Sequence, residues 1–164
     1  MRFDGNIEMH LNMRHGKYPL KSDSLFLVFE FTSVGPKGFV RKIILYSPTD
    51  IPNYFNLGFG DMDMVSGEIS DRSTTNNGDS LQVLATVAYT IYVFTARYPN
   101  ACIIAKGSTP ARNRLYRMGL ANQLTEVATD FEVYGRRNNR WQVFRKNVDY
   151  SAFMVRRKHI FVSS

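Results

Sequence analysis

The apolar residues in the first part of the chain fall in short runs that are typical of strands. Residues 25–31 and 39–46 are rich in aromatic and β-branched side chains, which suit a pleated surface. The Gly-Pro-Lys-Gly turn at 35–38 lies between them, so the two runs predict a hairpin. A third strand is predicted over 54–60, and its two glycines indicate a bulge or a close backbone approach.

The middle of the chain changes to helical spacing. Apolar residues recur every three or four positions over 81–95, which places them on one face of a helix. We predict this helix over 80–98, with Asp79 or Ser80 as its N-cap. Pro99 ends it, because proline cannot continue a helix.

A short strand and a second helix are predicted after this point. The wholly apolar run 101–105 suits a central strand that is covered on both faces. The turn at 107–110 then leads into a helix that extends to about residue 129, with Gly119 as a break point.

The last predicted elements are two strands. Residues 131–134 and 141–144 flank a turn centred on two asparagines, 138–139, which predicts a second hairpin. The order is therefore β-β-β-α-β-α-β-β, an α+β fold in which a mostly antiparallel sheet packs with two main helices. We expect an irregular N-terminal segment over 1–20 and a single domain over 21–164.

Composition narrows the classes of function. The chain has 164 residues, of which 44% are hydrophobic, enough for a real core. No apolar run approaches the roughly 18 residues of a membrane-spanning helix. One cysteine and three histidines near the chain ends argue against a disulfide, a zinc site and a histidine-based triad. We therefore predict a cytoplasmic protein without a metal or other cofactor; Asp61 and Asp63 are weak grounds for a cation site.

Basic residues are concentrated at the C-terminal end of the chain. The last 29 residues carry eight basic side chains and one acidic residue, Asp149. The net charge of this segment, +7, equals the net charge of the whole chain. Such a cluster fits a polyanion partner such as RNA, and the aromatic residues within it suit base stacking. The alternative is a solvated basic face that keeps the protein soluble.

The segment after the apolar run 101–105 is the strongest candidate site. Its helix begins with a hydroxyl cap and a proline, and helix N-termini bind anions. Arg112 opposes the helix dipole there, and a bound phosphate would offset that charge. The alternative is structural, with Arg112 paired to a carboxylate. The predicted anion or nucleic-acid site comprises Lys106, Ser108, Thr109, Arg112, Arg114, Tyr116 and Arg117, with Asp61 and Asp79 as supporting carboxylates.

Five motifs together resemble a family of small uncharacterised bacterial proteins. They are GPKG at 35–38, NLGFGD at 56–61, NNGD at 76–79, VLATV at 83–87 and GSTxARxRLY at 107–116, where x is any residue. The resemblance covers roughly residues 20–158. It implies a bacterial cytoplasmic setting and supplies no established activity or catalytic residue.

Two classes of function follow from these observations. The first is a protein that binds RNA or another phosphate-bearing ligand, in one version a toxin-type ribonuclease of a toxin–antitoxin pair. RNA is favoured over DNA because the chain has no recognition-helix or zinc motif. The second class is a non-catalytic module that docks a small partner protein or another copy of itself. The sequence leaves open whether the protein is an enzyme.

Overall fold

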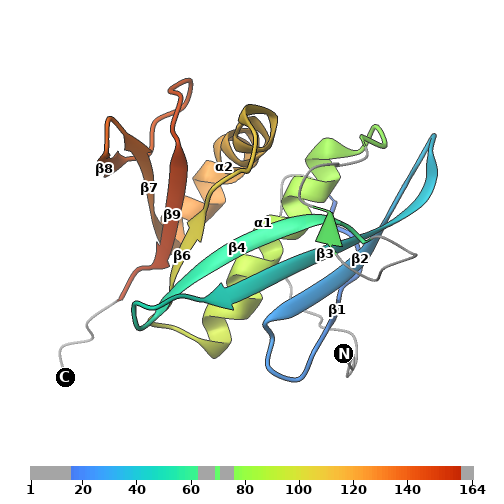
Figure 1. Ribbon diagram of the computed structural model, residues 1–164, viewed down its shortest axis with the longest axis horizontal. Helices are drawn as coiled ribbons and strands as arrows, with labels where there is room; N and C mark the ends of the chain where they lie inside the picture. The colour runs from blue at the N-terminus through green and yellow to red at the C-terminus, as the bar shows by residue number, and fades with distance from the viewer. Residues whose placement is uncertain (1–15, 63–68, 71–75, 160–164) are drawn as a thin grey trace.

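The fold is α+β, as the sequence predicts, with two helices packed on a mostly antiparallel sheet (Figure 1). A computed structural model describes residues 16–62, 69–70 and 76–159. The elements are β1 (Lys21–Ser22), β2 (Val28–Gly35), β3 (Gly38–Pro48), β4 (Tyr54–Met62), β5 (Ile69–Ser70), α1 (Ser80–Arg97), β6 (Cys102–Ala105), α2 (Pro110–Asp130), β7 (Phe131–Arg137), β8 (Arg140–Val143) and β9 (Ala152–Arg157).

In the described parts of the chain the sheet has nine strands. Eight follow the order β1-β2-β3-β4-β6-β9-β7-β8, and β5 pairs with β4 beside this path. Among the described residues, β4 and β6 are the one parallel pair, and the other neighbours are antiparallel. Parallel neighbours need a crossover connection, and α1 supplies it. The last strand in sequence, β9, lies between β6 and β7 near the middle of the sheet.

Both predicted hairpins and both predicted helices are confirmed. The first hairpin turns at Pro36 and Lys37, and the second turns at Asn138 and Asn139, which both have positive φ angles. The break predicted in the second helix is wrong, because α2 continues through Gly119. A Cβ there would lie 3.1 Å from a methyl group of Leu84, so the glycine allows α1 and α2 to approach closely.

Three strands were not predicted from the sequence: β1, β5 and β9. The first two are only two residues long, too short for a period to be recognised. The third lies within the basic C-terminal segment, and its apolar residues are Ala152, Phe153, Met154 and Val155. Its insertion brings that basic segment beside β6 and the start of α2.

The two helices cover the same face of the sheet (Figure 1). The ring of Phe94 on α1 stacks on Tyr46 at 4.1 Å, and Tyr116 on α2 meets Phe59 edge-on at 5.9 Å. These strand residues share one side of the pleat, as their cross-strand pairing shows. Both helices therefore lie on one side of the strand predicted over 101–105, and Cys102, which alternates with the helix-facing Ile103, is also buried. We term the side without helices the open face.

One core joins the segments that the sequence analysis placed together. It includes residues of the first hairpin, of α1 and of β6. Tyr18 and Leu20, which precede the expected domain start at residue 21, are buried in this core. The remainder of the expected irregular segment, 1–15, lies outside the described residues. Neither helix in the described parts of the chain is long and apolar enough to cross a membrane.

Tyr92 links α1 to the end of α2 and makes the fold sensitive to alkali. Its hydroxyl donates to the main-chain oxygen of Glu126 at 3.1 Å and contacts Asp130 Oδ2 at 3.3 Å. Burial raises the pKa of Tyr92 from 10.0 to about 12, and the Asp130 carboxylate adds to the shift. A raised folded-state pKa favours the neutral form, so this stabilisation is complete below the unfolded pKa and is lost as pH rises through the folded pKa.

We therefore expect the free energy of unfolding to fall between pH 10 and about 12. Urea titrations across this window measure the fall, and Tyr92→Phe should show a smaller one because it has no hydroxyl to ionise. The fall will not vanish in that variant, because burial also raises the pKa of Tyr46. An equally steep fall in the variant and the parent would contradict this assignment.

Candidate functional site

The turn between β6 and α2 is held by contacts of its own residues. Thr109 is the N-cap, and its hydroxyl accepts the main-chain N–H of Arg112 at 3.2 Å. The N–H of Gly107 donates to Asn113 Oδ1 at 2.6 Å. A Cβ at Gly107 would lie 2.5 Å from the main-chain nitrogen of Asn113, so only glycine fits here without a shift of the backbone. The predicted hydroxyl cap and the proline at the first position, Pro110, are both present.

Two clefts flank this turn. One, termed the sheet cleft, opens between the turn and β4 and has a volume of about 380 Å³. The other, termed the helix cleft, opens toward the segment before β9 and has a volume of about 570 Å³. The sheet cleft is lined by Leu45, Ser47, Asn56, Leu57, Gly58, Lys106, Gly107, Ser108, Arg112 and Tyr116. The helix cleft is lined by Gly107, Ser108, Thr109, Pro110, Asn113, Arg114, Arg117, Asp149, Tyr150 and Phe153.

The structure thus brings all seven predicted binding residues to the two clefts. Four of them line the sheet cleft: Lys106, Ser108, Arg112 and Tyr116. Ser108 also lines the helix cleft, together with Thr109, Arg114 and Arg117. The two predicted carboxylates, Asp61 and Asp79, line neither cleft.

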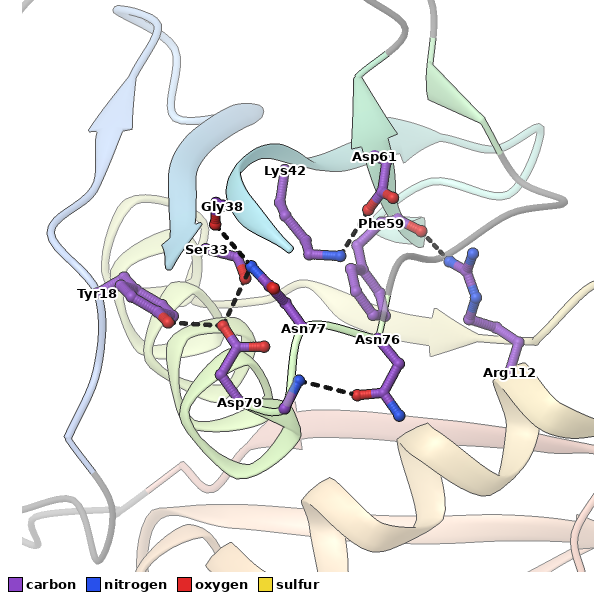
Figure 2. A network of polar contacts seen from close by, with 11 residues as sticks. Tyr18, Ser33, Gly38, Lys42, Phe59, Asp61, Asn76, Asn77, Asp79 and Arg112 are labelled. Atoms are coloured by element: carbon purple, nitrogen blue, oxygen red, sulfur yellow. Dashed lines mark hydrogen bonds and ion pairs between the residues drawn. The ribbon is translucent and has the colours of Figure 1, made fainter. Parts of the chain in front are cut away.

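Arg112 is buried and bonded within the fold, as in the structural alternative, but the contact described below is to a main-chain oxygen, whereas that alternative expected a carboxylate. Its side chain is only 5% exposed, although it borders the sheet cleft. The guanidinium donates a hydrogen bond to the main-chain oxygen of Phe59, and its central carbon lies 4.8 Å from the Phe59 ring (Figure 2). The planar donor group therefore ties the first turn of α2 to β4.

Tyr116 is also a packing residue. It is 6% exposed, and its ring lies edge-on to Phe59 at 5.9 Å and to Phe153 at 6.5 Å. Such edge-to-face contacts are favourable beyond the area that they bury. Tyr116 therefore forms the inner wall of the sheet cleft, where the helix layer meets the sheet.

Asp61 pairs with a buried lysine that the sequence analysis did not single out. The distance from Lys42 Nζ to Asp61 Oδ1 is 2.5 Å, and the side chains are 1% and 13% exposed (Figure 2). The two residues are cross-strand partners on β3 and β4, on the face that the helices cover. Alternation along β3 places Lys42 on that face, but a lysine gives no sign of a core position from its residue type.

Asp79 occupies the N-cap position of α1 without making the predicted side-chain cap. Its carboxylate instead accepts hydrogen bonds from Tyr18 and Ser33, both at 2.5 Å (Figure 2). Burial and the bond to Asp79 raise the pKa of Tyr18. Asn77, 1% exposed, joins this group by donating to the Gly38 oxygen at 2.9 Å. The network fixes the start of α1 against the first hairpin.

Of the four predicted basic residues, Arg112 is the buried one, and Lys106 is exposed. Arg114 is exposed, and Arg117 forms an ion pair with Asp149, whose side chain is 95% exposed. Exposed pairs of this kind contribute little to stability, so Arg117 keeps the freedom to exchange Asp149 for another anion.

The floor of the sheet cleft includes residues that sequence reasoning did not assign to it, namely Ser47 and Asn56. Gly58 also belongs to the floor, and the predicted bulge is absent there because its pairing with Leu45 continues the β3–β4 register. A Cβ at Gly58 would meet nothing within 4 Å. Packing therefore does not require this glycine, and its effect is to leave the floor bare.

The described residues contain no group of three histidine, cysteine, aspartate or glutamate side chains arranged to hold a metal ion. Of the two aspartates considered for a cation, Asp61 is the partner of Lys42, and Asp63 lies outside the described residues. The described residues therefore place cationic side chains and main-chain groups around the two clefts.

Comparison with known proteins places this arrangement in a family. The model of the Family of unknown function (DUF6934) matches residues 14–158. The chain belongs to this family. The match agrees with the resemblance to proteins without an established activity and covers both clefts. No curated protein and no solved structure matches the chain.

Proposed function

We propose that this protein binds RNA through one end of its sheet, beside the start of α2. The observation that carries the proposal is a cluster of basic residues there, which we term the basic end. It comprises Lys106, Arg114, Arg117, Arg136, Arg137 and Arg140.

These residues come from segments that are distant in sequence and adjacent in the fold. Asn113 in α2 donates to the Ser151 oxygen at 3.2 Å, and the N–H of Ser151 donates to the Arg136 oxygen at 2.8 Å. Ser151 thus connects the first turn of α2 to the end of β7. Strand pairing also brings these segments together, because Phe153 on β9 pairs with Ala105 on β6 on one side and with Gly135 on β7 on the other.

Charge and exposure at the basic end suit a polyanion. All its members are exposed except Arg117, which is half-buried. Residues 106–117 include four basic residues and residues 136–151 include five, whereas Asp149 is the one acidic residue of either segment. Lysine and arginine side chains that neutralise phosphates release counterions, which favours binding and makes it depend on salt. The two clefts flank the turn from which α2 starts, so phosphate groups have room beside these side chains.

The proposal concerns binding and does not extend to cleavage of RNA. A ribonuclease that does not use histidine needs another group for proton transfer, such as a tyrosine or a carboxylate, and Tyr116 is the tyrosine among the predicted site residues. That tyrosine packs between two phenylalanine rings with 6% of its surface exposed. Its position favours a structural role, so no described contact supports the toxin-type ribonuclease.

Removal of the charges at the tip of the second hairpin tests the proposal. We expect the triple variant Arg136→Ser, Arg137→Ser and Arg140→Ser to bind a fluorescently labelled RNA more weakly than the parent at low salt. The slope of log affinity against log salt should become shallower by about 2, since each phosphate contact on a single strand contributes about 0.7. Fluorescence anisotropy across a salt series measures both quantities.

A matched variant controls for total charge. Lys21→Ser, Lys37→Ser and Arg97→Ser also removes three exposed basic side chains, from β1, the first turn and the end of α1. It should keep the parent's salt slope. An equal loss of RNA affinity in both triple variants would show that net charge alone attracts the RNA. RNA binding that is absent, or that does not change with salt, would refute the proposal and favour the non-catalytic interaction module.

A further inference from the structure

We infer that the RNA is single-stranded and that it crosses the open face of the sheet, with one base stacked on Trp141. This inference rests on the proposed RNA binding and adds the form of the RNA and its path. It depends on a row of residues that runs across the strands from β8 to β4.

The row follows from strand pairing. Trp141 on β8 pairs with Arg136 on β7, which pairs with Ala152 on β9. Lys106 directly follows Ala105, the last residue of β6, and lines the sheet cleft together with Gly58 on β4. Directly paired residues share a face, and the neighbours of these positions, such as Phe153, face the helices. The row therefore lies on the open face.

Trp141 is an exposed aromatic ring at the outer end of this row. It is 39% exposed, and every residue of its short edge strand is exposed. The nearby ring of Tyr134 is covered by the Arg156 guanidinium at 5.6 Å, and Arg156 is itself paired with Glu132. Trp141 thus has the ring face that a base needs for stacking, whereas Tyr134 already has a cationic partner.

The remainder of the row suits a nucleic-acid backbone. Arg136 and Lys106 are exposed cations on either side of the small, buried Ala152. Beyond Lys106 the row reaches the sheet cleft, where Gly58 leaves the floor bare. Cations beside a stacking ring on an open sheet are the means by which proteins hold unpaired strands. A duplex keeps its bases stacked on one another and cannot present one to Trp141.

A second copy of the chain is the rival occupant of this surface, since β8 is an edge strand. Charge argues against it. Two copies joined through β8 would bring two sets of Arg136, Arg137 and Arg140 together, and like charges repel one another. RNA has the complementary charge.

The inference has a direct readout because Trp141 is the one tryptophan in the chain. A short single-stranded oligouridylate should quench its fluorescence at low salt, whereas a duplex RNA of equal length should not. Trp141→Ala should weaken oligouridylate binding by about tenfold, in keeping with the loss of one stacked base. Trp141→Phe should keep most of the affinity, because it retains a ring. Affinities come from anisotropy of labelled RNA, so they do not require the tryptophan.

Phe39→Ala is the matched control, because Phe39 is an 80% exposed aromatic residue on β3, in the other hairpin. It should bind and quench like the parent. If duplex and single strand bind equally well with no change in Trp141 fluorescence, the inference fails and the proposed function stands. If the fluorescence depends on protein concentration without RNA and the mass in solution doubles, a second copy covers β8 and the inference also fails. If neither RNA binds, both proposals fail together.

Discussion

Replacing Asp61 by alanine should lower the free energy of unfolding by about 3–5 kcal/mol, the cost of breaking a buried ion pair. The variant keeps the Lys42 ammonium, with 1% of its side chain exposed, and removes the carboxylate 2.5 Å from it. An ammonium that stays out of water carries a large desolvation cost, and the Asp61 carboxylate is a group that offsets it. Urea unfolding of the variant and the parent measures the difference.

The chain contains its own control for this prediction. Asp149 forms the other kind of ion pair, with Arg117, and its side chain is 95% exposed. Asp149→Ala should change the free energy of unfolding by less than about 1 kcal/mol, because water solvates both charges of an exposed pair. A double variant, Lys42→Met with Asp61→Ala, should recover part of the stability, since it leaves no buried charge behind. If Asp61→Ala and Asp149→Ala lower the free energy of unfolding by similar amounts, the burial of Lys42 does not determine how much its ion pair contributes to stability.

The contrast between these two pairs shows where prediction from the sequence ends. Periodicity identified both hairpins and both helices, because each depends on residues that are close in sequence. The turn at the start of α2 was likewise readable, because caps and prolines act within one helical turn. The contacts of its side chains could not be predicted in the same way, because Arg112 contacts Phe59, which is more than fifty positions away in the sequence.

The partners of the two supporting carboxylates could not be predicted for the same reason. Asp61 and Asp79 both follow glycine in loop-like motifs, which made each a candidate to orient an arginine of the turn. Strand pairing instead sets Asp61 opposite Lys42, and the first hairpin brings Ser33 to Asp79. One sequence does not fix which strands are neighbours, so the partner of a charged residue depends on topology that local patterns do not contain.

The missed strand β9 had the greatest consequence for the candidate site. Its apolar residues lie among basic residues, and the abundance of charge made the segment resemble a solvated tail. The alternation of Phe153 and Val155 was the available signal, since both are buried. Because β9 enters between β6 and β7, the basic residues before it lie beside α2. The basic end therefore depends on the order of the strands in the sheet. Composition shows that the C-terminal segment is basic, but it does not show which elements lie beside that segment.

Arg112→Ala should lower the free energy of unfolding by about 1.5–3 kcal/mol, the typical range for a hydrogen bond to a charged group, with further loss from packing. The guanidinium, 5% exposed, bonds to the Phe59 oxygen and lies over the Phe59 ring. Arg112→Lys should restore little of the stability, because an ammonium lacks the planar donor group that makes both contacts. Arg114→Ala is the control: it removes an exposed arginine from the same helix and should change stability by less than about 0.5 kcal/mol.

Thermal unfolding in phosphate and in chloride at equal ionic strength separates this structural role from the one that the helix dipole suggests. An anion that binds the folded protein raises the melting temperature by mass action. If phosphate binds through the exposed cations at the clefts, the phosphate-dependent rise should persist in Arg112→Ala and shrink in the double variant Lys106→Ser, Arg114→Ser. We expect the rise to persist in Arg112→Ala because the Arg112 guanidinium is already bonded to the Phe59 oxygen on β4. An Arg112→Ala protein with the parent's stability in chloride and no response to phosphate would show the opposite, that Arg112 is an anion ligand and that its bond to Phe59 contributes little.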